Sequence, residues 1–445
     1  MHKKILSNSG YLALASLIEK AGSFLMIPIL TSALSSKNYG LLMLAVSYAG
    51  FIILFIYNGL QSAFFRWYSL WQENFDKKVY EKVIFYFINI TGIFFIILMF
   101  FMNSFFNFEK FLGVGLYLLL ATVLASLLNI VFVLKGIIWV SENKAYNNLF
   151  FSLLKTVFTV SGVYLLIKIY PYPITKPVVE ILVIGILSSY FIYEYFFYYP
   201  KINGETFKKV IPVLKESLIY GWGLQISQLA FWVITSSDRI MVSHFMGNSY
   251  VAYYSVLMVG ITIMFVIVAF NNSFSVFYNK MISENVSVKE INRYLFTYLI
   301  YAFIIILVYK FILFYFSSFI ISLLSTKEYL VVSDYMYLTS DILLFYFAYL
   351  LFSRYFHAKK MIKIIIATVF ISAVVNVMLN YFFIKMFGVL GALIATITAY
   401  LSMSLISFFF LYKKTGFDNI KKLMFLFLSV VCIDFLIDVF LYKGW

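Results

Sequence analysis

The sequence predicts an all-α protein that crosses a membrane many times. Of its 445 residues, 63% are hydrophobic and only 12% are charged. Apolar runs of about 20 residues, the length that crosses a hydrocarbon core as a helix, recur from end to end. Such runs cross only as helices, because each backbone polar group must find its partner within its own segment. The period-2 alternation of a membrane barrel does not occur.

The apolar runs predict thirteen spans. The first begins with a basic stretch like that of a signal peptide, but Glu19 and Lys20 interrupt it and it runs well past signal length. We therefore interpret it as an uncleaved first span. The later ones are apolar runs of membrane length, with boundaries accurate to about 2 to 4 residues. In order, the expected spans are 11–34, 40–61, 83–102, 114–138, 146–168, 177–199, 214–245, 249–273, 294–316, 333–356, 361–385, 388–412 and 421–442.

The distribution of basic residues predicts the orientation. With these spans, 23 of the 34 Lys and Arg residues fall on the side of the N-terminus and 8 on the other side, with Lys20, Lys155 and Lys310 within spans. Short cytoplasmic loops carry the excess of positive charge. The N-terminus is therefore expected in the cytoplasm of a cell, with the chain in the cytoplasmic (inner) membrane. The net charge of +15 needs no nucleic-acid partner to explain it.

The sequence offers little for an enzyme. Cys432 is the single cysteine, and His2, His244 and His357 lie on different spans or sides. These residues exclude a disulfide framework and make a metal site improbable. Metalloprotease, serine-hydrolase and P-loop motifs do not occur. The large outer loop that a membrane glycan polymerase or acyltransferase needs is also missing, so we expect no enzymatic activity and no cofactor.

An internal repeat appears when the sequence is shifted by 212 residues. Residues 34–54 then fall on 246–266, and each copy is a polar outer turn followed by a small residue and an apolar helix. Six spans, an even number, precede the seventh span at 214–245, so both halves enter the membrane in the same orientation. Parallel repeats of this kind place a transport pathway between them. We expect lobes at 1–200 and 201–412 around a central cavity, and an extra C-terminal transmembrane segment at 413–445.

Three stretches resemble a known family. They are "ILTSALSSKNYGLLMLAVSYAGFIILFIYNGLQSAFFRWYS", "DRIMVSHFMGNSYVAYYSV" and "NVMLNYFFIKMFGVLGALIATITAYLS". In this order they resemble the lipid-linked oligosaccharide flippases of the multidrug/oligosaccharidyl-lipid/polysaccharide exporter superfamily. The resemblance covers roughly residues 5 to 412. Members of that family usually have twelve or fourteen spans, whereas this sequence predicts thirteen.

The resemblance implies a function. It implies a flippase that moves a polyprenyl-pyrophosphate glycan from the cytoplasmic to the outer leaflet by alternating access, for surface polysaccharides such as O-antigen. The implied partners are this glycan substrate, membrane lipid and other membrane proteins of polysaccharide assembly. The alternative is a multidrug or metabolite cation antiporter on the same fold, for which acidic cavity residues and a sealed lipid side are expected.

Two charge pairs within spans are the main candidates for the substrate site. A charge near the centre of a span costs about 2.5 to 3.5 kcal/mol, so such residues are functional candidates. Arg239, beside Asp238, is expected about 10 Å below the outer turn, and Lys20, beside Glu19, about 21 Å below it. We expect Lys20 and Arg239 to bind pyrophosphate, and Glu19 and Asp238 to balance them when the site is empty. The alternatives are a structural clamp for the second pair and simple snorkelling for Lys20.

Further polar residues extend this hypothesis. Lys155 is a weaker cationic candidate, and Arg66, at the inner end of the second span, is placed to receive a phosphate or to act as a positive-inside anchor. Asn376 and Asn380 share one helix face and are candidates for sugar contact, with interhelical hydrogen bonding as the alternative.

Acidic residues within spans raise the possibility of ion coupling. Asp341 lies in the tenth span, and Asp434 and Asp438 lie in the last one. Each is a candidate carrier of H⁺ or Na⁺. The first span also contains Gly22 and Pro28, a combination that permits a kink in a gating helix.

The predicted orientation is testable because Cys432 is the single native thiol. On a Cys432→Ser background, single cysteines at residues 37 and 248 are expected to react with an impermeant maleimide added outside intact cells. Cysteines at residues 78 and 286 are expected to react only after the membrane is opened. The reverse pattern would refute the orientation.

Overall fold

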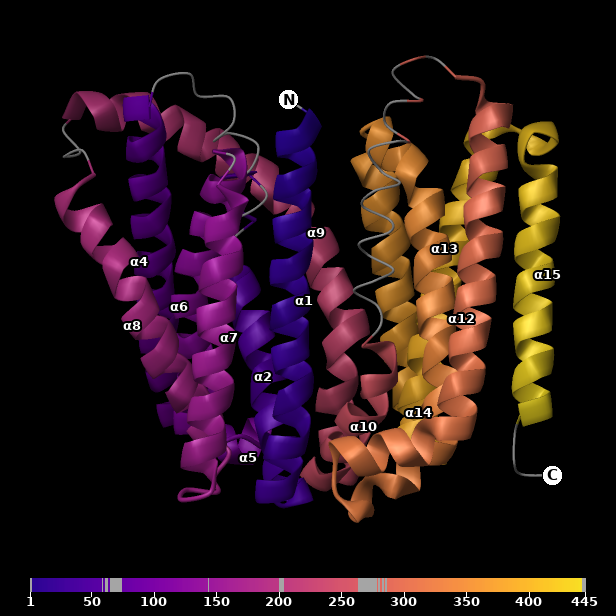
Figure 1. The fold of residues 1–445 in the computed structure, drawn as a ribbon, viewed down its shortest axis with the longest axis horizontal. Helices are drawn as coiled ribbons and strands as arrows, with labels where there is room; N and C mark the ends of the chain where they lie inside the picture. Colours follow the sequence, from indigo (N-terminus) through magenta and orange to yellow (C-terminus); the bar gives the residue numbers. More distant parts are fainter. Residues whose placement is uncertain are drawn as a thin grey trace. The chain divides into compact units, whose positions relative to one another are not determined.

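The computed structural model confirms the all-α class. In the part of the chain that it describes, every regular element is a helix (Figure 1). The described residues are 2–57, 59–60, 63–64, 74–142, 144–199, 204–262, 278, 281, 284 and 286–441. Their α-helices are α1 (His2–Ala33), α2 (Ser36–Tyr57), α4 (Asn74–Phe106), α5 (Phe108–Leu112), α6 (Leu116–Ser141), α7 (Ala145–Ile167), α8 (Thr175–Phe197), α9 (Gly204–Met246), α10 (Asn248–Leu257), α12 (Val288–Leu324), α13 (Thr339–Ala358), α14 (Ile362–Thr415) and α15 (Phe417–Leu441). Two 3₁₀ segments are η1 (Met258–Ile261) and η2 (Lys327–Leu338).

Ten helical segments of the described residues are long and apolar enough to cross a membrane. The chain is therefore a multi-pass membrane protein. α9 is not among the ten, and polar residues such as Gln225, Asp238 and Arg239 interrupt its apolar stretches. The predicted span 249–273 begins as α10 and η1, and its residues from 263 onward lie outside the described part.

The chain forms two compact units, Met1–Leu229 and Ala230–Trp445, and the boundary between them in the sequence falls within α9. The division into lobes at residues 200 and 412 stays a prediction.

In the N-terminal unit α1 packs against α7, and α6 packs against α2, α4 and α8. Aromatic side chains from α4, α6 and α8 form much of this core, with Phe85 stacked on Tyr195 and Trp139 edge-on to Phe191.

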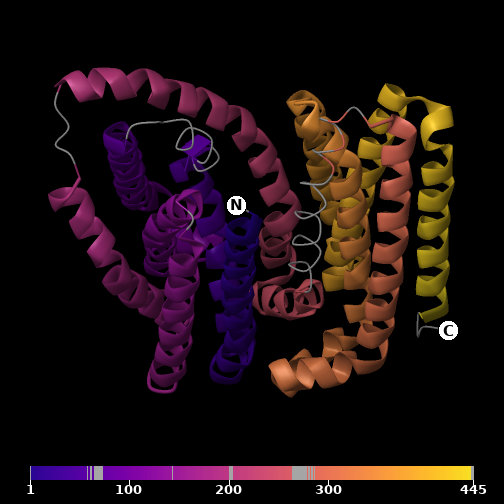
Figure 2. The ribbon, with the colours of Figure 1, turned by 45° about the horizontal axis from the view of Figure 1, so that its top comes forward.

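In the C-terminal unit α13 packs along α14, and α12 packs against η2, α13 and α15. Figures 1 and 2 show α15 beside α12 at the edge of this unit. The start of α12 carries a capping signal, because the Ser287 side chain accepts a hydrogen bond from the backbone N–H of Glu290. The predicted last span, 421–442, corresponds to α15, which is long and apolar enough to cross the membrane.

Gly388 turns α14 back on itself. Its φ of 60° and ψ of −133° are not helical, and a side chain at this position would be strained. Ser402 donates a hydrogen bond to Ser372 at 3.0 Å although 30 residues separate them. A straight helix would hold these residues about 45 Å apart. α14 is therefore a hairpin of two antiparallel legs, which correspond to the predicted spans 361–385 and 388–412.

Gly22 is a packing residue in the N-terminal unit. α1 runs as a helix through both Gly22 and Pro28. A Cβ atom on Gly22 would collide with the Cγ2 methyl group of Thr156 on α7. The glycine therefore lets α1 and α7 approach closely, as small residues do between membrane helices.

The packing role of Gly22 predicts a compensating pair of substitutions. Gly22→Ala is expected to destabilise the protein by about 1 to 3 kcal/mol, because the new methyl group overpacks the α1–α7 contact. Adding Thr156→Ser removes the opposing methyl group and is expected to restore most of this loss. Thermal unfolding in detergent would measure both effects. Equal melting temperatures for wild type and Gly22→Ala would show that the contact is not tight.

Candidate functional site

A buried polar network surrounds Asp238 in the C-terminal unit. The Asp238 side chain lies on α9 and the residue is 1% exposed. Its Oδ2 accepts hydrogen bonds from the hydroxyl groups of Tyr254 on α10 and Thr396 on α14, each at 2.6 Å. Its Oδ1 accepts a bond from Nδ2 of Asn380 on α14, also at 2.6 Å. Three neutral donors from two other helices therefore hold the carboxylate.

The turn at Gly388 makes this network possible. Asn380 and Thr396 lie on opposite legs of the α14 hairpin, and both reach the same carboxylate. Asn376 lies one helical turn before Asn380, and its Oδ1 accepts a bond from the Asn380 amide at 3.1 Å. Nδ2 of Asn376 and Oδ1 of Asn380 are buried without a hydrogen-bond partner. The Asn376 amide can therefore still donate a hydrogen bond, and the Asn380 oxygen can still accept one.

The placement of the two asparagines bears on their predicted role. Both are fully buried, and Asn376 also accepts a weak bond from Ser237 at 3.4 Å. They bond to side chains of other helices and expose nothing to a ligand in this structure. This arrangement favours the interhelical alternative over direct sugar contact.

Arg239 is not the partner of Asp238. Its Nε donates to Oγ of Ser255 at 3.2 Å, and its Nη1 donates to the Thr235 carbonyl at 3.3 Å. The guanidinium carbon also lies 6.0 Å from the centre of the Tyr254 ring. Within the described residues no carboxylate forms an ion pair with it. This half-buried cation therefore has only neutral partners.

In the N-terminal unit Glu19 pairs with Lys155 instead of its neighbour Lys20. The Lys155 ammonium lies 2.6 Å from Oε1 of Glu19 and 3.3 Å from Oδ1 of Asn129. Ser152 donates to the same Glu19 oxygen at 3.0 Å. Adjacent helical residues point about 100° apart, and Glu19 here takes its ion pair from α7. The balancing of Lys20 by Glu19 stays a prediction. Lys20 is exposed and has no ion pair among the described residues.

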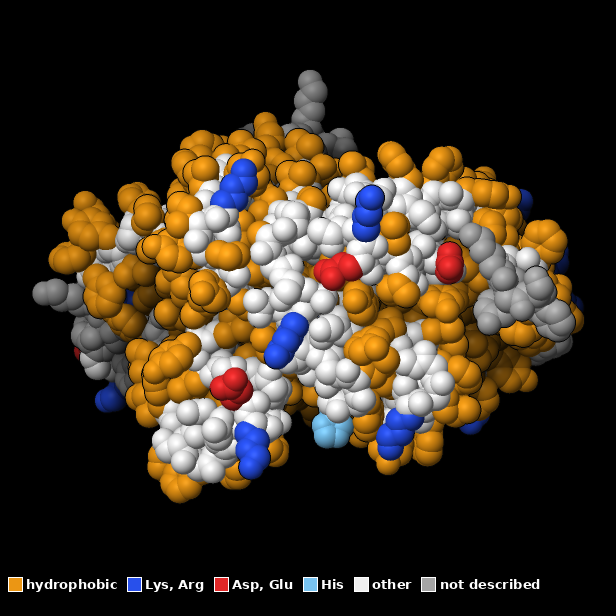
Figure 3. Space-filling view, turned by 90° about the horizontal axis from the view of Figure 1, so that it is seen from below, with side chains coloured by type: hydrophobic (Ala, Val, Ile, Leu, Met, Phe, Trp, Pro, Cys, Tyr) orange, Lys and Arg blue, Asp and Glu red, His pale blue; other side chains and the backbone are white. Residues whose placement is uncertain are grey.

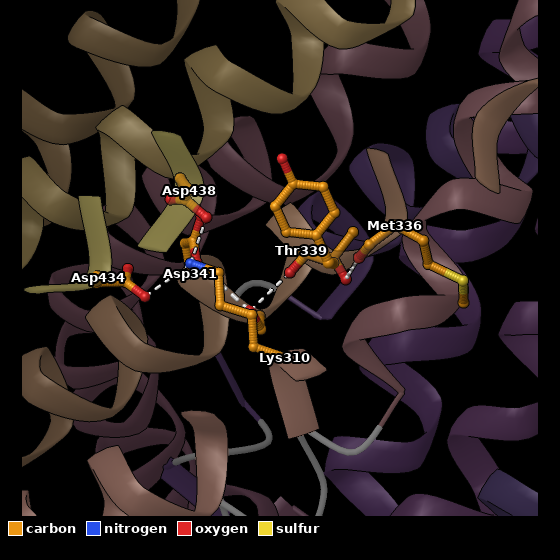
Figure 4. A network of polar contacts seen from close by, with 8 residues as sticks. Lys310, Met336, Thr339, Asp341, Asp434 and Asp438 are labelled. Atoms are coloured by element: carbon orange, nitrogen blue, oxygen red, sulfur yellow. Dashed lines mark hydrogen bonds and ion pairs between the residues drawn. The ribbon is translucent and has the colours of Figure 1, made fainter. Parts of the chain in front are cut away.

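A third charged group lies between α12, α13 and α15 (Figure 4). The Lys310 ammonium is 2.7 Å from Asp341, 2.7 Å from Asp434 and 2.5 Å from Asp438. Oxygens of the three carboxyl groups lie within 4.8 Å of one another, close enough to hold a metal ion. The ammonium of Lys310 instead supplies the positive charge among them. Asp341 is thus placed in an ion-pair cluster away from Asp238.

Arg66 lies outside the described residues, and its predicted role stays a prediction.

The surface of the described part is mostly apolar. On the end face seen in Figure 3, the charged side chains are few and scattered, and hydrophobic side chains gather toward the rim. This surface suits a hydrocarbon surrounding, in which charges gather inside the protein.

Comparison with known families decides the identity of the chain. The profile of the family described as "Polysaccharide biosynthesis protein" matches residues 5–277 of the 445. The chain belongs to this family. A second profile, MatE, matches residues 224–382 of this polysaccharide biosynthesis protein. The two matches confirm the resemblance to the multidrug/oligosaccharidyl-lipid/polysaccharide exporter superfamily.

Solved structures share the fold of this polysaccharide biosynthesis protein. The lipid II flippase MurJ, in an inward closed conformation, has 18% sequence identity and a TM-score of 0.69, over 98% of this chain and 97% of MurJ. An inward-facing multidrug resistance MATE family transporter has 14% identity and a TM-score of 0.67, over 94% of this chain and 98% of that one. A superfamily transporter from Pyrococcus furiosus has 14% identity and a TM-score of 0.64, over 93% and 95%. No curated protein matches the chain.

Sequence reasoning missed most partners of the charged residues in this family member. Tyr254 and Thr396 were not expected beside Asp238, and Lys310 was not expected beside Asp341. A usable signal existed for Lys310, because a lysine in the middle of a span needs a carboxylate partner. Asp434 and Asp438 stand four residues apart and therefore face the same way on α15.

The network around Asp238 predicts unequal effects for two neighbouring substitutions. Asp238→Leu is expected to leave the donors of Tyr254, Asn380 and Thr396 unpaired, at about 1 to 3 kcal/mol each. Arg239→Gln strands no carboxylate and is expected to change stability by about 0.5 kcal/mol or less. Thermal unfolding of both purified variants in detergent would compare them. Equal destabilisation would show that Arg239 does clamp Asp238, with Asp238→Asn as the isosteric control.

Proposed function

We propose that the chain is a flippase for lipid-linked oligosaccharide. In this proposal it moves a polyprenyl-pyrophosphate glycan from the cytoplasmic to the outer leaflet of the cell membrane by alternating access, for surface polysaccharide biosynthesis. It catalyses no covalent reaction. The observation that carries the proposal is the match to the polysaccharide biosynthesis protein family over residues 5–277. It is joined by a cation in each unit, Lys20 and Arg239, that forms no ion pair with a carboxylate of the described residues.

The nature of the cargo explains why such cations are useful. A lipid tail can stay in hydrocarbon while its headgroup crosses, but a pyrophosphate and a hydrated sugar chain cannot cross without a polar route. A cation held by neutral groups is free to pair with phosphate. Among the described residues, Arg239 forms its hydrogen bonds with Ser255 and Thr235 and lies against the Tyr254 ring. Lys20 is exposed and without an ion pair among the described residues.

Lys155 has a different place in the proposal. Its ammonium is held by Glu19, whose side chain is 42% exposed. A phosphate that approaches this exposed carboxylate can take its place beside Lys155, since both are oxygen anions that accept from an ammonium. Glu19 thus keeps Lys155 neutralised until an anionic headgroup arrives.

The charges disfavour the alternative of a multidrug or metabolite cation antiporter. A cationic cargo would meet Arg239 and Lys20, which carry the same sign of charge. Like charges in a medium of low dielectric constant repel strongly. An anionic headgroup has the opposite sign and fits both positions.

We also propose Asp238 as the position of a coupling cation, H⁺ or Na⁺. It is a buried carboxylate whose hydrogen-bond partners are all neutral, so its site carries a negative charge that a small cation would neutralise. Asn376 and Asn380 place amide oxygens next to it, and oxygens are the usual ligands of hard cations. Asp341 is a weaker candidate because Lys310 already pairs with it.

The cargo hypothesis predicts which substitutions abolish transport. In cells that lack their own flippase, Arg239→Gln and Lys20→Gln are expected to abolish restoration of surface polysaccharide, because each removes a phosphate-binding charge. Arg239→Lys and Lys20→Arg are expected to retain partial function. The readouts are surface polysaccharide, lipid-linked oligosaccharide accumulated inside, and membrane abundance of each variant.

Lys168→Gln is the matched control. Lys168 is an exposed cation at the end of α7, bonded to Tyr164 at 2.7 Å, and its loss is expected to leave transport unchanged. Normal surface polysaccharide in the Gln variants of Lys20 and Arg239 would refute the binding role. Altered resistance to organic cations with unchanged polysaccharide would support the antiporter instead.

A further inference from the structure

The part of α9 within the N-terminal unit, residues 204–229, packs on its neighbours through one face. The hydroxyl groups of Ser217 and of Tyr80 on α4 share a hydrogen bond of 2.7 Å. Gln225 donates through Nε2 to a backbone carbonyl of α2, also at 2.7 Å. Between them, a Cβ atom on Gly59 would collide with the carbonyl oxygen of Gly221. Ser217, Gly221 and Gln225 follow one another at intervals of four residues, so they form one buried helix face.

A second face of the same part of α9 is exposed. At about 100° per residue, its centre lies about 120° round the helix from the buried face. Its side chains recur at intervals of three and four residues, which keeps them in line along the helix. We call this face the α9 stripe, and its members are Lys208, Ile211, Lys215, Ile219, Trp222 and Ile226.

The two lysines of the α9 stripe lie in its first half. Neither forms an ion pair with a carboxylate of the described residues. Glu205 and Glu216 lie on the flank of the stripe, about 60° and 100° round the helix from the nearest lysine. Lys208 and Lys215 are separated by two helical turns, about 10 Å. Because a lysine ammonium stands on a flexible four-carbon stem, both can reach one anion between them.

The apolar members of the stripe continue from the lysines across one leaflet. α9 begins at Gly204, ahead of the predicted span 214–245, and Figure 2 shows its first part curving across one end of the N-terminal unit. Pro212 lies within this part, where a proline permits a bend. α1 begins at the same end (Figure 1). From Lys215 to Ile226 the stripe is about 16 Å long, half the thickness of a hydrocarbon core.

This arrangement fits a lipid with a multiply charged anionic headgroup. Phosphate oxygens accept charge-assisted hydrogen bonds from ammonium groups. A pyrophosphate carries at least two negative charges and matches two lysines, whereas the headgroup of phosphatidylglycerol carries one. The lipid tail then has an exposed apolar surface to follow, formed by Ile219, Trp222 and Ile226. Charge complementarity therefore favours a pyrophosphate lipid over an ordinary anionic phospholipid.

We propose that the α9 stripe is a docking site for the polyprenyl-pyrophosphate carrier lipid on the side of the membrane where the N-terminus lies. Lys208 and Lys215 hold the pyrophosphate, and the tail lies along Ile219, Trp222 and Ile226. The basic residues of the sequence predict this side to be the cytoplasm, where the cargo of a flippase is collected. This inference rests on the proposed function, because the ligand is the cargo named there.

Photochemical capture in cells that lack their own flippase tests the docking site. A benzophenone amino acid in place of Trp222 reacts on illumination with lipid that lies against the stripe, and glycan attached to the protein is the readout. We expect glycan to be captured there. Lys208→Gln with Lys215→Gln is expected to lower the capture about 10- to 30-fold, since each lysine contributes a factor of about five at a membrane surface.

Two controls match these changes. Lys413→Gln with Lys414→Gln removes the same charge from exposed lysines in the last turn of α14 and is expected to leave capture unchanged. The benzophenone amino acid in place of Ile186, which is 72% exposed on α8, is expected to capture phospholipid and no glycan. Equal glycan capture at positions 186 and 222, or capture of phospholipid alone at position 222, would overturn the docking site.

The same cells separate this inference from the proposed function. A wild-type chain that fails to restore surface polysaccharide would overturn both. Restored surface polysaccharide without glycan capture at position 222 would overturn the docking site alone.

A binding measurement with Trp222 intact covers the case of a photoreactive variant that does not fold. On a Lys20→Gln with Arg239→Gln background, which removes the charges of the proposed internal site, the protein in phosphatidylcholine nanodiscs is expected to bind polyprenyl pyrophosphate. Adding Lys208→Gln and Lys215→Gln is expected to abolish that binding. Displacement of the ligand by an equal amount of phosphatidylglycerol would show a general site for anionic lipid and overturn the choice of the carrier.

Discussion

Hydrocarbon offers no partner to a charge, and this constraint organises the described structure. Three lysines within the helices, Lys135, Lys155 and Lys310, pair with carboxylates brought from other helices. Lys155 of α7 pairs with Glu19 of α1, and Lys135 of α6 pairs with Glu81 of α4 and Glu194 of α8. The Lys135–Glu81 pair is costly to break, because its side chains are only 6% and 2% exposed and one charge would be stranded in a dry site. The ion pairs thus specify which helices are neighbours, and apolar packing then fills the space between them.

Charged residues that form no ion pair within the described part of the chain are candidates for the substrate site. Among the described residues Arg239 forms hydrogen bonds only with neutral groups, and Asp238 beside it is held by three hydroxyl and amide donors. Adjacent residues of a helix face different directions, so the two opposite charges do not cancel each other. A site that keeps a cation and a carboxylate apart can bind an anionic headgroup at one and a small cation at the other. This separation is the physical basis for our proposal of a flippase for a pyrophosphate-linked glycan over a cation exporter.

The α14 hairpin shows how one backbone position controls a site. Gly388 adopts a positive φ that other residues rarely take, and the chain reverses there. The reversal places Asn380 and Thr396 on facing legs, so both contact Asp238. Without the turn, these side chains would lie about 24 Å apart along a single helix. Local backbone freedom in one residue is therefore a condition for the polar network.

Composition and the length of the apolar runs determined the all-α membrane class, because backbone satisfaction in hydrocarbon leaves few alternatives. The motifs also indicated the superfamily. Charged residues within apolar spans identified Lys20, Asp238 and Arg239 as candidates for the site. Only the tertiary structure decided the pairing. Glu19 forms its ion pair with Lys155 of α7 and not with its sequence neighbour Lys20. Lys310 pairs with Asp434 and Asp438 of α15, more than a hundred residues later in the chain. Pairing depends on which helix faces come together, and that is set by packing across the whole unit, which no local pattern records.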